Sequence, residues 1–174
     1  MWQFLTSKKQ FFLFLLFLLF ICKGVIGQTD REFWFVAPAV SDSHGDEPVL
    51  LRITTGNTSA KEVVIEQPAN PSFPTIVENN IPANSVRTIN LTAMGLQDEV
   101  ENRYINSNGI HNKGIHISSS DPVTVYYEVS RQNNCDIFAL KGTNALGSEF
   151  YVPFQTLGWN AYSDSYSAID MVAT

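Results

Sequence analysis

Cysteine is scarce in this 174-residue chain, which contains only Cys22 and Cys135. Cys22 lies in an amino-terminal segment with the features of a removable leader, so one thiol remains in the expected mature protein. A single thiol cannot form an internal disulfide. This excludes the disulfide-stapled scaffolds common among small secreted domains. The mature protein must therefore depend on a hydrophobic core, and a chain of this length is able to build one.

Basic residues are also few, with eleven Lys and Arg against seventeen Asp and Glu and a net charge of −6. Lys8, Lys9 and Lys23 belong to the leader, which contains no acid. Its removal leaves eight basic residues against seventeen acids, a net charge of −9. Nucleic-acid phosphates require a basic patch, so we expect no nucleic-acid partner.

No apolar run in the chain is long enough for a membrane span, which needs about 20 residues. The longest, Phe11–Cys22, follows the basic pair Lys8 and Lys9, and Val25 and Gly27 occupy the −3 and −1 positions before residue 28. This is the pattern of a secretory signal. We predict a cleaved signal peptide over residues 1–27, a secreted or cell-surface location, and contact with the membrane only through that leader.

Catalytic motifs are missing as well: neither H-E-x-x-H nor G-x-S-x-G occurs. His44, Asp46 and Glu47 share one loop and leave a remote hydrolase hypothesis, although a polar loop turning at Gly45 is the interpretation we favour. We expect His116 to be solvated on the polar face of its strand. We predict no catalytic residues and no cofactor.

Long stretches of 3.6-residue periodicity are absent, and turn signals recur at the short spacing typical of all-β proteins. Alternation is clearest in residues 122–129, where Val123, Val125 and Tyr127 share one face. A tight connection is expected at Ser118–Pro122, and Ala93–Tyr104 has room for one helical turn. We predict an antiparallel β-sandwich with strands near residues 32–37, 48–54, 62–67, 74–77, 86–91, 114–119, 122–129, 136–141, 148–154 and 167–173.

A near-repeat suggests how these strands are organised. Glu32–Pro38 (EFWFVAP) recurs in altered form as Glu149–Phe154 (EFYVPF), and each copy precedes a second apolar run. We interpret residues 28–146 as one β unit and residues 147–174 as the opening strands of a second, similar unit. The chain stops inside the apolar segment Val172–Thr174, so we expect it to be an amino-terminal fragment of a longer protein.

Several segments occur in a characteristic order along the chain: Asp30–Phe35 (DREFWF), Leu51–Thr55 (LRITT), Gly114–Ser119 (GIHISS), Val123–Glu128 (VTVYYE), Asp136–Lys141 (DIFALK) and Leu146–Val152 (LGSEFYV). Taken in this order, they resemble the IgGFc-binding protein amino-terminal domain family, in the branch found in large secreted proteins of the Bacteroidota. The family pattern has a "G-x-E-F" start, a "kGi-I-x-S" strand, a "P-V-x-V-Y" strand and an "L-G-x-E-Y/F" block. The resemblance implies a secreted bacterial protein that often carries a downstream gliding-motility-associated domain.

Two groups of residues are candidates for ligand contact. Trp159, Tyr162 and Tyr166 lie among small polar residues, a composition suited to glycan or protein contact, although they could instead cover the edge of the core. A weaker calcium hypothesis places carboxylates at one end of the sandwich, although the spacing is not that of an EF-hand. Its carboxylates are Asp42, Asp46 and Glu47, joined by Asp121 or Asp136.

We therefore expect a non-catalytic binding or adhesion module at the start of a larger bacterial extracellular protein. Its partner would be an extracellular protein or a glycan, and further domains of the same chain would follow. The alternative is a structural spacer in a gliding-motility or cell-surface assembly. The remote alternative is a hydrolase that uses the loop of His44.

Overall fold

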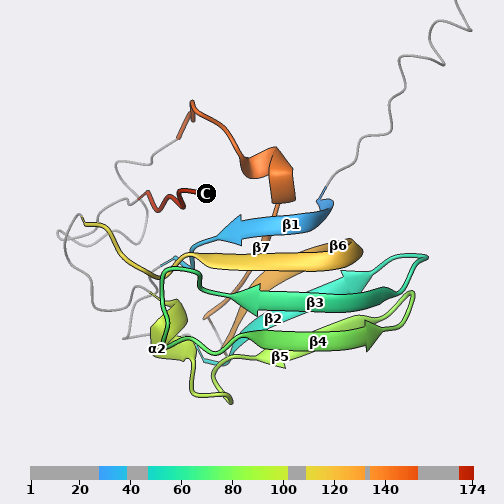
Figure 1. The fold of residues 1–174 in the computed structure, drawn as a ribbon. Coiled ribbons are helices and arrows are strands. Elements are labelled where there is room, and N and C mark those ends of the chain that lie inside the picture. The colour runs from blue at the N-terminus through green and yellow to red at the C-terminus, as the bar shows by residue number, and fades with distance from the viewer. Residues whose placement is uncertain (1–27, 39–46, 102–108, 132–133, 153–168) are drawn as a thin grey trace, which may run out of the picture.

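The computed structural model describes residues 28–38, 47–101, 109–131, 134–152 and 169–174, which form mainly strands (Figure 1). Every strand pairing is antiparallel, so the predicted all-β antiparallel class is confirmed. The elements in chain order are β1 (Thr29–Phe35), β2 (Val49–Thr55), β3 (Ala60–Glu66), β4 (Ile76–Ile81), β5 (Val86–Asn90), the short helix α2 (Gln97–Val100), β6 (Ile115–Arg131), β7 (Asn134–Ala139) and the 3-10 helix η1 (Gly142–Ala145).

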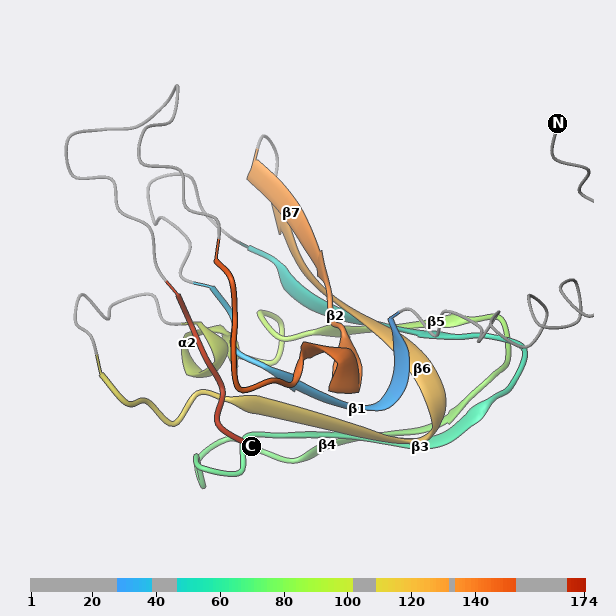
Figure 2. The ribbon, with the colours of Figure 1, turned by 90° about the horizontal axis from the view of Figure 1, so that it is seen from above.

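Strand β6, which is 17 residues long, organises the whole sheet. Its first half pairs with β1 and β3, and its second half pairs with β2 and β7, while β4 and β5 extend the sheet beyond β3 and β2. Figure 2 shows β6 curling from one side of the molecule to the other. We call β1, the first half of β6, β3 and β4 the front layer, and we call β2, β5, β7 and the second half of β6 the rear layer. The sandwich is not confirmed, because all seven strands belong to one curled sheet.

The bend in β6 is built by its Ser-Ser-Asp-Pro segment. The register with β1 shifts between Asp30 and Glu32, where one residue of β1 lies opposite four residues of β6. Ser120 Oγ accepts hydrogen bonds from the backbone N–H groups of Lys61 and Glu62 in β3, at 2.9 and 3.1 Å. Ser119 Oγ donates to the carbonyl oxygen of Asp121 at 2.7 Å. The separate connection predicted at Ser118–Pro122 is therefore wrong, because serine hydroxyls bind backbone groups there and the strand continues through the bend.

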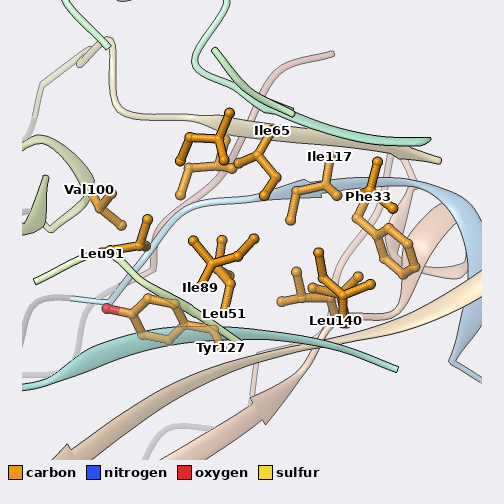
Figure 3. Packing of buried hydrophobic residues seen from close by; sticks show 14 of the residues in the cluster. Phe33, Leu51, Ile65, Ile89, Leu91, Val100, Ile117, Tyr127 and Leu140 are labelled. Carbon is orange, nitrogen blue, oxygen red and sulfur yellow. The ribbon is translucent and has the colours of Figure 1, made fainter. Parts of the chain in front are cut away.

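Apolar side chains from both layers meet in one core (Figure 3). Alternation along each strand sends every second side chain inward, and these inward side chains are almost completely buried. The two layers thus cover each other's apolar faces in the way that two packed sheets would. The largest contributors from the front layer are Phe33, Ile65 and Ile117, and those from the rear layer are Leu51, Ile53 and Tyr127.

The open side of the curl, where β4 and β5 form the two edges, is bridged by an ion pair. Arg87 Nε lies 3.2 Å from Glu78 Oε2. Glu78 is the register partner of inward-facing Val63, and Arg87 is the partner of inward-facing Ile53, so both charges point toward the core side. Inward-pointing charges on edge strands discourage pairing with another chain.

A clasp joins the beginning of the unit to its end. The carboxylate of Asp30 in β1 accepts hydrogen bonds from the backbone N–H of Thr143, at 2.8 Å, and from its hydroxyl, at 2.5 Å. Partial burial of Asp30 favours the neutral acid, but the Thr143 bonds and the amides of Arg31 and Glu32 outweigh it and lower the pKa of Asp30. Gly142 makes the approach possible, because a Cβ there would lie 2.5 Å from Asp30 Cβ.

Replacing Gly142 with alanine should open this clasp. The residue has a φ of +54°, a strained region for alanine, and the new methyl group would collide with Asp30. We expect a loss of roughly 2–3 kcal/mol in the free energy of unfolding, measured by denaturant melts. Gly56→Ala is the matched control, since its Cβ meets nothing within 4 Å and the change should be close to neutral. Equal losses in the two variants would contradict the clasp.

Low pH should weaken the contact between Asp30 and Thr143. Because the folded-state pKa of Asp30 is lowered, its contribution to stability is complete above the unfolded-state pKa and is lost as the pH falls through the folded-state pKa. We expect wild type to lose stability relative to Asp30→Asn below about pH 4, as followed by melts across the acid range. A difference between the two proteins that does not change with pH would contradict this assignment.

The second half of the near-repeat does not form strands in its described part. Residues 148–152 and 169–174 are outside any strand, so the strands predicted over 148–154 and 167–173 are wrong where they can be compared. No neighbouring strand pairs with these segments, and Phe150 and Ile169 are exposed. Val172 instead lies against the first unit, since a Cβ on Gly114 would be 3.4 Å from Val172 Cγ1. The second unit itself stays a prediction.

Candidate functional site

Most residues that the sequence analysis proposed for ligand contact lie outside the described residues. This holds for Trp159, Tyr162 and Tyr166, and also for Asp42, His44 and Asp46. Glu47 is described and is exposed. Asp121 and Asp136 stand on β6 and β7, and no group of three potential metal ligands occurs in the described part of the chain. The calcium hypothesis therefore gains no support from the residues that can be compared.

A different group of side chains converges on the outer surface of the front layer. Strand register places Trp34 of β1, His116 of β6 and Glu66 of β3 in one row across three neighbouring strands. Alternation explains why they face outward, since Phe33 and Ile117 beside them point into the core. We call these outward positions, together with their neighbours, the front face: Glu32, Trp34, Glu62, Val64, Glu66, Val77, Asn79, His116 and Ser118.

His116 is the centre of this surface. Its ring stacks on the indole of Trp34, with centroids 4.3 Å apart and an interplanar angle of 22°. His116 Nδ1 lies 3.0 Å from Glu66 Oε1. On the other side Nε2 lies 3.4 Å from Glu32 Oε1, but the geometry is not that of a hydrogen bond and this buried nitrogen has no partner among the described residues. Trp34 Nε1 donates to the same Glu32 oxygen at 3.1 Å, which holds the indole in place.

These contacts make His116 a scaffold for the groups around it. Its side chain is only 17% exposed, whereas those of Glu32 and Glu66 are 52% and 40% exposed. What the row offers to solvent is therefore mainly two carboxylates on either side of a fixed aromatic stack. The expectation that His116 is a solvated residue is wrong, because the register brings an indole on one side and a glutamate on the other against the ring.

The front face carries negative charge without a matching cation. None of its outward positions is Lys or Arg. Within the described part of the chain, the ion-pair partner of both Glu32 and Glu66 is the imidazole of His116 alone. Glu62 adds a third exposed carboxylate on the same face of β3.

On the rear layer, in contrast to the front face, the outward carboxylate is paired with an arginine. Glu128 of β6 forms a two-bond pair with Arg52 of β2, through Arg52 Nε and through Nη2 at 3.1 Å. The hydrogen bond from Arg52 holds the pKa of Glu128 below its usual range. Arg52 Nη1 also donates to Thr88 Oγ1 at 3.2 Å. The rear carboxylate is thus already neutralised by the protein, and a shallow depression beside it is lined by Glu128, Cys135, Asp136 and Ile137.

A third polar cluster lies inside the molecule, near α2. Glu101 is completely buried and accepts hydrogen bonds from the Tyr127 hydroxyl at 3.0 Å and from Gln97 Nε2 at 3.3 Å. Lys113 Nζ donates to the carbonyl oxygens of Asp98 and Glu101, both at 2.5 Å, and so caps the end of the helix. The cluster has no exposed surface at Glu101, which indicates a structural role for that carboxylate.

The front face escaped prediction because its parts are distant in sequence. Positions 32, 34, 66 and 116 become neighbours only when β1 and β3 pair with opposite edges of β6. The one local signal was the outward parity of Glu32 and Trp34 in a strand whose next residue, Phe35, points inward.

In the described part of the chain, no helix has the length and apolar character needed to cross a membrane.

Comparisons with known proteins found no relative of this chain. No family model, no curated protein and no solved structure matches the chain.

Proposed function

We propose that this protein is a non-catalytic binding module that acts outside the cell and makes contact through its front face. The observation that carries the proposal is the fixed Trp34–His116 stack flanked by exposed carboxylates that the described chain leaves without a Lys or Arg partner. Exposed charge around an ordered aromatic ring is the composition of a contact surface. The amino-terminal leader supports secretion, and the resemblance to the IgGFc-binding amino-terminal domains supports a role at the bacterial surface.

The arrangement supports contact better than catalysis. A catalytic imidazole needs a nitrogen within reach of a substrate proton. The His116 ring is covered by Trp34 on one face, and its two nitrogens face Glu32 and Glu66. The hydrolase hypothesis rests on the loop of His44, which lies outside the described residues. The structural spacer remains the second candidate and is favoured by the long, continuous β6, which pairs with four other strands and joins them into one unit.

Binding through the front face can be tested with the mature protein, residues 28–174. We expect saturable binding to at least one member of a panel of purified extracellular proteins and glycans, and Trp34→Ala should weaken that binding about tenfold. Tyr126→Ala, an outward aromatic change on the rear layer, is the matched control and should leave the affinity unchanged. Absence of saturable binding across the panel would favour the spacer, and equal losses in both variants would remove the front face from consideration.

A further inference from the structure

We infer that the partner of the front face is a basic polypeptide segment, one that presents Arg or Lys side chains in an extended stretch. This inference rests on the proposed binding function and specifies its ligand. It follows from the charges of the face, from the neighbouring strands that form it and from the position of Trp34, each of which restricts the chemistry of a complementary surface.

Charge excludes one class of ligand and favours the opposite one. Glu32, Glu62 and Glu66 all point outward from the front layer, and no outward position of this face carries a full positive charge to offset them. Phosphates, sulfated glycans and other anions would be repelled. A cationic side chain would gain carboxylates that are already desolvated in part by the neighbouring rings, and such charge-assisted bonds are stronger than neutral ones.

Geometry favours a guanidinium or ammonium group near His116. Glu66 and Glu32 contact opposite nitrogens of the one imidazole ring, so the two carboxylates flank it. A cation at this surface can approach the two carboxylates, whose positions are fixed by the imidazole and, for Glu32, also by the indole N–H of Trp34. On the rear layer Arg52 occupies the corresponding role beside Glu128 from within the protein. The front face is arranged to receive such a cation from outside.

The shape of the face fits an extended segment. Figure 1 presents the front layer toward the viewer, and none of the described helices crosses it. The outward positions form rows across the strands: Glu32, Ser118 and Val64 form one row, and Trp34, His116 and Glu66 form the next, so Glu32 and Glu66 lie diagonally across β6. Alternate side chains of an extended peptide are roughly 7 Å apart. That spacing lets basic residues of such a segment reach more than one of the carboxylates while the residues between them lie over Ser118 and His116 of β6.

The test measures binding of short labelled peptides to the mature protein by fluorescence anisotropy. One peptide alternates Arg and Ser, a second replaces Arg with Gln, and a third replaces Arg with Glu. We expect saturable binding of the Arg peptide alone, weakened at higher ionic strength. Glu66→Gln and Glu32→Gln should each weaken it roughly tenfold. Asp136→Asn, which removes the same charge from exposed β7, should change the affinity less than about twofold because surface charges a Debye length of ~8 Å or more away are largely screened.

Three results would overturn the inference: no binding of the Arg peptide, equal binding of the Gln peptide, or equal losses in Asp136→Asn and the front-face variants. Circular dichroism and melts of each variant establish that the fold is intact. The proposed function fails separately. If a neutral glycan or another protein binds, loses affinity in Trp34→Ala, and the Arg peptide does not compete, the front face is a binding site and only the basic ligand is wrong.

Discussion

Replacing Phe33 with alanine should lower the free energy of unfolding by about 3–5 kcal/mol. Phe33 is fully buried in β1 and packs among the front-layer side chains of the core (Figure 3). Its register partner on β6, Ile117, is also fully buried, so removing the ring leaves a cavity between two strands that the sheet cannot close. Such cavities destabilise beyond the lost transfer free energy of the side chain. Denaturant melts of the mature protein measure the loss.

The adjacent residue provides a matched control. Trp34 is one position along the same strand but faces outward, where it stacks on His116. Trp34→Ala should cost only about 1 kcal/mol, since an aromatic pair at a surface contributes ~0.5–1.5 kcal/mol. Phe33→Leu should cost less than about 1.5 kcal/mol and stays measurable if the alanine variant does not fold. A larger loss for Trp34→Ala than for Phe33→Ala would mean that the two faces of β1 are assigned the wrong way round.

Alternation made the strands predictable. The apolar runs around residues 33, 51, 65, 125 and 138 were each expected in a strand and each lies in one. Turns rich in Gly, Pro and Asn were expected between these strands, and they could be recognised because the backbone preferences of those residues act locally. The single helical turn expected within Ala93–Tyr104 is α2.

The curl of the sheet could not be derived from the same signals. Ser118–Pro122 has the composition of a turn, and only the pairing of its two flanks with β1, β3 and β2 shows that the strand continues. The binding of Ser120 to the backbone of β3 is a contact between residues about 59 positions apart. Local composition does not encode such a partner, so a bend inside one strand and a loop between two strands look alike.

The near-repeat also shows that local sequence composition does not determine whether a segment forms a strand. Glu32–Phe35 and Glu149–Val152 have similar strand propensity, yet only the first copy is a strand. The first copy has an open edge of β6 beside it, whereas the described part of the second has no neighbouring strand. Strand propensity reflects fit to a sheet, and without that sheet it does not produce a strand.

The candidate site depended on tertiary pairing even more strongly. Aromatic residues in a polar loop drew attention to Trp159, Tyr162 and Tyr166, which lie outside the described residues, while Trp34 was assigned only to a strand. The surroundings of His116 were predicted wrongly, because its two acidic neighbours are far away in the sequence. Glu32 is 84 positions and Glu66 is 50 positions before it. Only the three-strand row identifies them as one surface.

Removing the carboxylate of Glu101 should destabilise the protein by about 2–4 kcal/mol. Glu101→Ala leaves the Tyr127 hydroxyl and the Gln97 amide buried without the oxygens that now accept their hydrogen bonds. Each buried donor left without an acceptor costs about 1–3 kcal/mol. The side chain of Glu101 is fully buried, so its removal also leaves a void at the end of the core next to Val100. Denaturant melts compare the variant with wild type and with Glu62→Ala, an exposed glutamate whose loss should stay within about 0.5 kcal/mol.

A double-mutant cycle separates the hydrogen bond from the void. Tyr127→Phe removes only the hydroxyl that donates to Glu101, and it should cost about 1–2 kcal/mol because the buried Glu101 oxygen loses this donor. In the Glu101→Ala background the same change should cost much less, since the hydrogen bond to the Glu101 oxygen is already absent there. The difference, a coupling of about 1–2 kcal/mol, measures the contact itself. Additive losses would show that Tyr127 and Glu101 stabilise the protein independently, and the buried carboxylate would then act on the fold through its other contacts.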